Sequence, residues 1–165
     1  MRVLGIDTSL RSTGVAVVES RGSAMTAVEH GRIRNSVRMP LSECLRRLDA
    51  GIREILARAR PEAVAIEDIF FCKNVRTAVV LGEARGAVIA ACAGAGIPIF
   101  EYSPRRVKQA VVGFGGADKS QVRRMVMTIL NLREEPEEDA GDALAIAICH
   151  LNNRTVHASL APKPI

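Results

Sequence analysis

Three apolar segments at the start of the chain are separated by connections too short to contain a helix. They cover residues 2–7, 13–19 and 25–34, and a Gly-containing turn at residues 21–23 separates the last two. Connections this short join antiparallel neighbours, because a parallel pair needs a longer crossover. The chain is therefore predicted to start with a three-stranded antiparallel meander.

The rest of the chain alternates between helical and strand patterns. Apolar residues at helical spacing predict a helix that opens at residues 40–42 and ends before Pro61. Beyond it we predict strands over 62–67 and 97–101 and helices over 74–95, 104–112, 120–131 and 137–152. This order predicts an α/β fold with a mixed five-stranded sheet flanked by helices. We expect a single domain over 1–157 and a loose C-terminal tail over 158–165.

Composition favours a protein of the cytoplasm. A hydrophobic content of 48% can supply a core without disulfides. No stretch approaches the ~20 uninterrupted apolar residues of a membrane span, and the N-terminus lacks a signal-peptide pattern. The four cysteines form no C-x-x-C pair, so we expect free thiols in a reducing compartment; they are Cys44, Cys72, Cys92 and Cys149.

Four acidic residues carry the functional prediction. Asp7 and Glu67 each end an apolar run, where an unpaired buried carboxylate would be costly. Asp139 and Asp142 are three residues apart at the start of the last predicted helix, so they share a face. Taken singly, Asp7 also fits a turn and Asp139 also fits a helix N-terminus. As a set, oxygen ligands of this kind suit Mg²⁺ or Mn²⁺ and predict a two-metal phosphodiesterase.

Charge is unevenly distributed along the chain, whose net charge is +5 from 23 Lys and Arg against 18 Asp and Glu. Basic residues dominate between residues 102 and 125, and acidic residues dominate between 133 and 142. A metal-dependent nuclease needs a basic surface for phosphates beside an acidic pocket for cations. Such runs also occur on solvated helix faces, so the distribution supports this function without requiring it.

An ordered series of motifs, from residue 2 to about 150, resembles the RuvC Holliday-junction resolvases. The series consists of Gly5-Ile-Asp7, Thr13-Gly14, Ala65-Ile-Glu67 with Phe70 and Lys73-Asn74, Leu81-Gly82-Glu-Ala-Arg-Gly86, Val107-Lys-Gln-Ala-Val-Val-Gly113, Lys119-Ser-Gln-Val122 and Asp139-Ala-Gly-Asp-Ala-Leu-Ala-Ile146. Gly-Ile-Asp alone is a weak signal, and the order of the series makes it specific.

The resemblance implies a ribonuclease H-like fold and a homodimer that cuts four-way DNA junctions with Mg²⁺ beside a branch-migration motor. It assigns metal binding and catalysis to the four acids, contacts with phosphate to Lys108 and Lys119, and a junction-wedging role to Phe70. We add neighbouring residues as expected DNA contacts, namely Phe71, Lys73 and Arg76. For the Phe70-Phe71 pair a core-filling role remains open.

Two further features concern geometry. Thr8-Ser9 stands where the family commonly has Pro-Gly, so the turn after Asp7 differs. Gly82 and Gly86 are poor helix formers, and close approach of another helix or chain would explain them. Their helix is our candidate for the dimer contact.

The mechanism expected from these residues uses two cations roughly 4 Å apart on one phosphate, leaving 5′-phosphate and 3′-hydroxyl ends. The main alternative is a ribonuclease H-like nuclease that acts on another branched or hybrid nucleic acid. An actin-like ATPase or sugar kinase would need a second domain, and a junction-binding protein without activity would not need all four acids. The sequence chooses neither between Mg²⁺ and Mn²⁺ nor among cleavage sequences.

Overall fold

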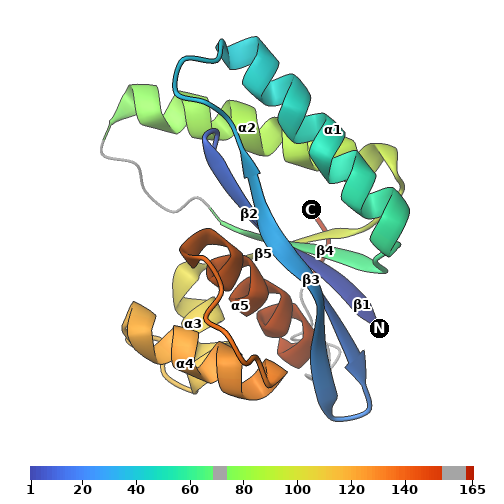
Figure 1. The fold of residues 1–165 in the computed structure, drawn as a ribbon, viewed down its shortest axis with the longest axis vertical. Coiled ribbons are helices and arrows are strands. Elements are labelled where there is room, and N and C mark those ends of the chain that lie inside the picture. The colour runs from blue at the N-terminus through green and yellow to red at the C-terminus, as the bar shows by residue number, and fades with distance from the viewer. Residues whose placement is uncertain (69–73, 154–162) are drawn as a thin grey trace.

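A mixed five-stranded sheet in the order β3-β2-β1-β4-β5 runs through the computed structural model, which describes residues 1–68, 74–153 and 163–165 (Figure 1). The first three strands are antiparallel, whereas β4 and β5 run parallel to β1. The predicted meander and mixed sheet are confirmed. The strands are β1 (Arg2–Asp7), β2 (Ser12–Arg21), β3 (Ala24–Arg34), β4 (Ala63–Glu67) and β5 (Ile99–Tyr102).

Two strand boundaries differ from the predicted ones for local reasons. The β2–β3 hairpin is longer than expected, because Gly22 adopts a φ of 62° and allows a short turn. The fifth strand starts at Ile99 rather than residue 97, since Pro98 has no N–H to donate to a ladder.

Helices cover both faces of the sheet, and their observed ends agree closely with the predicted ones. The predicted cap Asn74 accepts hydrogen bonds from the N–H groups of Arg76 and Thr77. The pair α1 and α2 packs on one face, and α3, α4 and α5 lie on the other (Figure 1). The helices are α1 (Leu41–Ala59), α2 (Val75–Gly94), α3 (Pro104–Val112), α4 (Lys119–Leu130) and α5 (Glu138–Asn153).

Strand alternation divides the core into two apolar clusters. Leu4 and Ile6 of β1 point toward α1 and α2, whereas Val3 points toward α5. Eleven residues of α5 are buried, so this helix lies at the centre of its cluster. The middle of β1, at Gly5, lies against Ala143 and Ala147 of α5, and the end of β1 lies close to the first turn of that helix.

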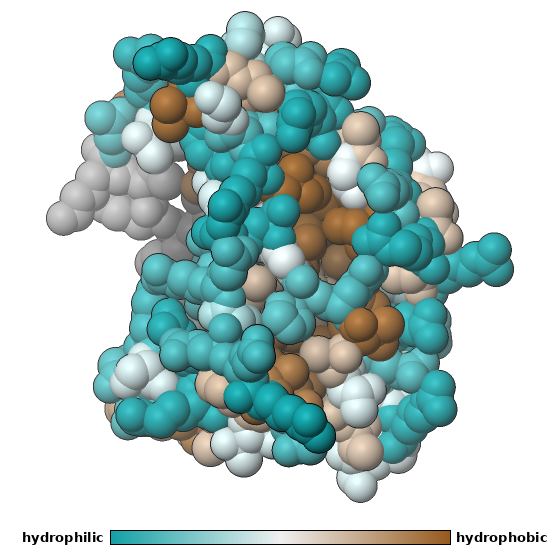
Figure 2. Space-filling model, viewed as in Figure 1, coloured by the Kyte–Doolittle hydropathy of each residue, from teal (hydrophilic) through white to brown (hydrophobic). Residues whose placement is uncertain are grey.

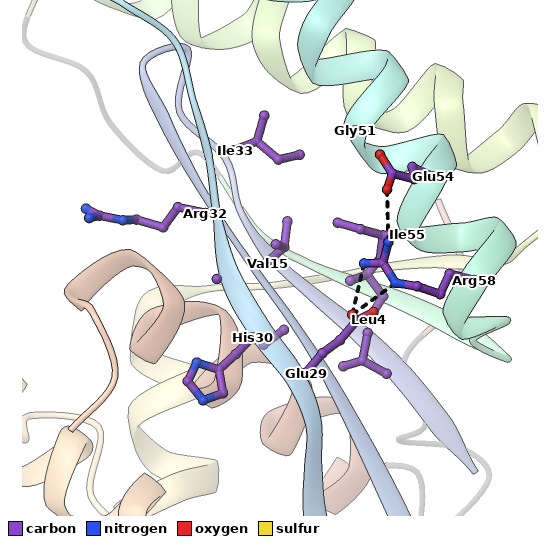
Figure 3. Close-up of a pocket in the computed structure, with 13 residues that line it drawn as sticks. Leu4, Val15, Glu29, His30, Arg32, Ile33, Gly51, Glu54, Ile55 and Arg58 are labelled. Atoms are coloured by element: carbon purple, nitrogen blue, oxygen red, sulfur yellow. Dashed lines mark hydrogen bonds and ion pairs between the residues drawn. The ribbon is translucent and has the colours of Figure 1, made fainter. Parts of the chain in front are cut away.

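The sheet and α1 do not close completely at the edge strand β3. A hollow of about 270 Å³ remains there, with an apolar floor that includes Leu4, Val15 and Ile55. Apolar surface is visible in this hollow (Figure 2), and the Arg58 guanidinium binds Glu29 and Glu54 at its rim (Figure 3). Its two carboxylates are paired with an arginine, and none of the four predicted metal-binding acids lines this hollow.

The structure also bears on the cysteines, on the possibility of a membrane-spanning helix and on the C-terminal end of the chain. The described cysteines, Cys44, Cys92 and Cys149, are free and buried. By length and composition α2 is the one described helix that could cross a membrane, but it packs against α1 and contributes Ala84 and Val88 to the core. The N–H of Ile165 donates to the carbonyl oxygen of Ile99 at 3.0 Å, which brings the chain end to β5.

Candidate metal centre and nucleic-acid interface

Asp7 and Glu67 lie at the ends of adjacent parallel strands. Ile6 of β1 is in register with Ile66 of β4, and the next residue in each strand is the carboxylate. Both carboxylates alternate away from Ile6 and Ile66, which pack toward α1 and α2, so they are on the α5 face. The sheet register alone thus brings together two acids that are sixty residues apart in sequence.

Glycines on the same face allow α5 to approach the sheet at this point. Gly14 is the register partner of Asp7, and a Cβ placed on it would lie 1.9 Å from the carbonyl oxygen of Asp139. A Cβ on Gly5 would lie 2.1 Å from the carbonyl oxygen of Ala143. Only a residue without a side chain fits at either position while α5 keeps its place. The Gly-Ile-Asp and Thr-Gly motifs therefore have a packing role beside the carboxylate.

One cavity lies where the ends of β1 and β4 meet the helices α3, α4 and α5. It has a volume of about 420 Å³ and contains three of the predicted acids together with both predicted lysines. Its polar lining consists of Asp7, Glu67, Asp142, Lys108 and Lys119, from β1, β4, α5, α3 and α4 respectively. Side chains from five separate elements thus meet in one place, beside an apolar wall that includes Val107, Val122 and Ile146.

The carboxylates in this cavity are electrostatically coupled. Burial, followed by the charges of Asp142, Glu67 and Asp139, raises the pKa of Asp7 from 3.8 to about 7. Burial and then Asp142 raise the pKa of Glu67 above its ordinary value, and burial also raises the pKa of Asp142. A group of acids that resists full ionisation is one that a divalent cation would stabilise in the ionised form.

The two lysines differ in their contacts. Lys119 Nζ lies 2.8 Å from Glu138 Oε1 and 3.6 Å from Asp142 Oδ2, and its side chain is 67% exposed. The hydrogen bond to Glu138, and then the charge of Asp142, raise the pKa of Lys119. Lys108 lowers the pKa of Glu67 through its charge. Both lysine side chains therefore lie beside the acids of the cavity.

Asp139 is the predicted acid whose side chain does not line the cavity. Its Oδ2 accepts a hydrogen bond from the Ser12 hydroxyl and lies 3.4 Å from Arg32 Nη1. Within the described part of the chain, no three side chains of His, Cys, Asp or Glu are grouped closely enough to hold one metal ion. Three of the four acids therefore line one cavity, whereas Asp139 is paired with Ser12 and Arg32 beside it; Asp142 lies 3.6 Å from Lys119 Nζ.

Sequence reasoning assigned no role to Arg85, although it was part of the quoted motif. Its guanidinium donates to the carbonyl oxygen of Glu67 at 2.6 Å and forms an ion pair with Glu101. The residue is only 9% exposed, and a buried arginine requires such partners. Arg85 therefore fastens the end of β4 to α2. The available signal was a charged residue directly before the apolar run 86–94 of the same helix.

The remaining predicted DNA contacts lie around the start of α2. Arg76 is exposed in its first turn, adjacent to the cap Asn74. Phe70, Phe71 and Lys73 lie outside the described residues. His150, for which no catalytic role was predicted, is buried and bonded to the Tyr102 hydroxyl through Nδ1 at 2.8 Å.

Comparison with known proteins connects this architecture to one family. The family model described as crossover junction endodeoxyribonuclease RuvC matches residues 3–150. The RuvC protein of Citrifermentans bemidjiense is 44% identical over 96% of this chain and 96% of its own. The RuvC protein of Pelotomaculum thermopropionicum is 47% identical over 99% of this chain and its full length. The structure of Thermus thermophilus RuvC in complex with Holliday junction substrate superimposes with a TM-score of 0.91 at 35% identity, covering 100% of both chains.

The sheet order, the helices on both faces and the acids beside α5 define a nuclease of the ribonuclease H-like class. Within that class, the chain belongs to the RuvC family of crossover junction endodeoxyribonucleases. The predicted family, fold and endonuclease function are thereby confirmed.

Proposed function

We propose that this protein resolves four-way DNA junctions by hydrolysing phosphodiesters at the site formed by Asp7, Glu67, Asp139 and Asp142. The observation that carries the proposal is the shared cavity, in which three of these acids meet Lys108 and Lys119. The acids come from three separate elements, and only the fold unites them. Membership of the RuvC family supports the reaction class, and the lining of the cavity supports these residues as the site.

The four acids fit divalent cations by their donor chemistry. Carboxylate oxygens are the preferred ligands of Mg²⁺ and also suit Mn²⁺. Burial, and then the charges of the neighbouring acids, raise the pKa of Asp7, and bound cations would offset both effects, which supports the same assignment. We propose two Mg²⁺ ions per site. When bound, they would lower the pKa of a water and stabilise negative charge on the phosphate.

Lys108 and Lys119 serve to hold the phosphate backbone. An exposed ammonium group beside an acidic cluster offsets repulsion between that cluster and the polyanion. Lys119 already spans Glu138 and Asp142, so it is held beside the carboxylates without being buried. The expected products are 5′-phosphate and 3′-hydroxyl ends.

Symmetric cutting of a junction requires two sites related by a two-fold axis, so we propose a homodimer. One face of α2 supports this assignment. Val75 and Val79 are 80% and 54% exposed, and a Cβ on Gly82 or Gly86 would meet nothing within 4 Å. These residues follow one another at helical spacing on an apolar helix and offer close approach to a second copy. By family resemblance we further propose cytoplasmic location and cooperation with a branch-migration motor.

The decisive experiment uses labelled four-way junction, linear duplex and RNA–DNA hybrid, each with and without Mg²⁺. We expect paired nicks in the junction only, and only with the cation. Asp7→Asn should bind the junction and fail to cut it. Asp49→Asn is the matched control, because Asp49 is an aspartate that is paired with Arg53 on α1. Preferred cutting of the hybrid would instead favour a nuclease with a different substrate.

A further inference from the structure

Two side chains from neighbouring strands converge on one oxygen of Asp139. Ser12 at the start of β2 donates its hydroxyl to Oδ2, and Arg32 of β3 places Nη1 3.4 Å from the same oxygen. Gly14 and Arg32 are register partners, so these groups share the α5 face of the sheet. In Figure 3, Arg32 extends away from the hollow beneath α1, whereas Ile33 points toward it.

Arg32 is anchored in this position by a second carboxylate. Its Nε and Nη2 lie 2.6 Å and 2.5 Å from the two oxygens of Glu137, a bidentate arrangement. Glu137 immediately precedes α5, and its carbonyl oxygen accepts from the N–H of Gly141. Arg34 also binds Glu137, at 2.6 Å. Both arginines therefore fasten the start of α5 to β3, but only Arg32 reaches Asp139.

The contacts on Asp139 are confined to one side of its carboxylate. Both groups donate to Oδ2, and no described residue donates a hydrogen bond to Oδ1. The Arg32 and Asp139 side chains are 20% and 27% exposed, so solvent screens this pair only partly. When one oxygen of a carboxylate is held by hydrogen bonds, the other oxygen points in a defined direction. Hydrogen bonds from residues that do not themselves bind the metal commonly orient metal ligands in this way.

We propose that Arg32, assisted by Ser12, is a positioning residue that orients Asp139 for binding a divalent cation. This inference rests on the proposed function of Asp139 as a metal ligand. Removing Arg32 should change the Mg²⁺ requirement in opposite directions, depending on whether Arg32 positions Asp139 or only adds positive charge. A nearby positive charge that only repelled the cation would, when removed, make the protein need less Mg²⁺. Loss of positioning makes it need more.

The test compares Arg32→Met with Arg34→Met. Both substitutions remove a β3 arginine that pairs with Glu137, so both weaken the anchoring of α5, and only the first frees Asp139. The measurements are the Mg²⁺ concentration for half-maximal junction nicking and, without DNA, the Mg²⁺ concentration for half-maximal thermal stabilisation. We expect both to rise about 10-fold in Arg32→Met and to stay within about twofold of wild type in Arg34→Met.

Two further variants sharpen the result. Arg32→Lys keeps the charge and should recover part of the Mg²⁺ affinity, and Ser12→Ala should raise the Mg²⁺ requirement in the same direction. Equal shifts in Arg32→Met and Arg34→Met would overturn the inference, because anchoring of α5 would then explain the effect. A lowered Mg²⁺ requirement in Arg32→Met would overturn it as well. If Mg²⁺ changed neither the junction nicking nor the thermal stability of the wild-type protein, the proposed metal site itself would be overturned, and this inference with it.

Discussion

Asp7 should limit the stability of the protein when divalent cations are removed, and its replacement by Asn should therefore stabilise the fold. The carboxylate is held beside Glu67 and Asp142 in a partly buried site, and its pKa is raised to about 7. An ionised group in such a site destabilises the folded state relative to the unfolded chain, where the same group is solvated. Asparagine has the same shape without the charge.

The magnitude follows from the shift in pKa. The pKa of Asp7 rises from 3.8 to about 7, and each pKa unit corresponds to about 1.4 kcal/mol. Ionisation of Asp7 therefore destabilises the folded state by at most about 4 kcal/mol near neutral pH. Because solvent reaches part of the site and the buried amide of Asn has its own desolvation cost, we expect a net gain of about 1–3 kcal/mol. For a chain of this size, that gain raises Tm by about 3–10 °C.

The sign of the pH dependence is fixed by the same shift. Between pH 3.8 and about 7 the unfolded chain has lost the proton on Asp7 while the folded protein retains it. Wild-type stability due to this group is therefore highest below the unfolded pKa and falls as pH rises toward the folded pKa. The stabilisation by Asp7→Asn should be larger at pH 8 than at pH 5. Thermal unfolding of both proteins in EDTA at these pH values measures it directly.

Added Mg²⁺ should reverse the order, because it stabilises the wild-type protein more than a variant that lacks a proposed ligand. Asp49→Asn again serves as the control and should change stability by less than about 0.5 kcal/mol, since surface ion pairs contribute little. A lower Tm for Asp7→Asn than for wild type in EDTA at pH 8 would refute the electrostatic argument. A gain of equal size at pH 5 and pH 8 would do the same.

Other predictions test the packing that forms the site. Gly14→Ala should cost at least about 1–3 kcal/mol in denaturant unfolding and reduce cutting more than junction binding, because its Cβ would overlap the backbone of the first turn of α5; wild-type activity would contradict this. Arg85→Met should destabilise the fold by about 1–3 kcal/mol, because it leaves the carbonyl oxygen of Glu67 and the half-buried carboxylate of Glu101 without their partner. Replacing Glu101 by Met as well should restore part of that loss in the same unfolding assay. Val79→Asp should give a folded monomer in analytical ultracentrifugation, and an unchanged dimer would exclude this face of α2 as the contact.

Much of the fold was predictable because its signals are local. Apolar alternation located the strands, and caps such as Asn74 located the helix starts. The positions of Asp7 and Glu67 at strand ends, and of Asp139 and Asp142 three residues apart, were also visible in the printed sequence. Their donor chemistry as a set already predicted one metal site, and the ordered resemblance made that prediction specific. No local pattern states which strands will be neighbours.

The sequence by itself determined which groups are present and which elements carry them. Only the tertiary structure decided how they face one another. Sheet order placed β4 beside β1, the missing side chain of Gly14 let α5 approach Asp7, and the contacts of Ser12 and Arg32 fixed one carboxylate oxygen of Asp139. Such relations arise between residues distant along the chain, where packing and charge act through space and leave no periodic trace in the sequence.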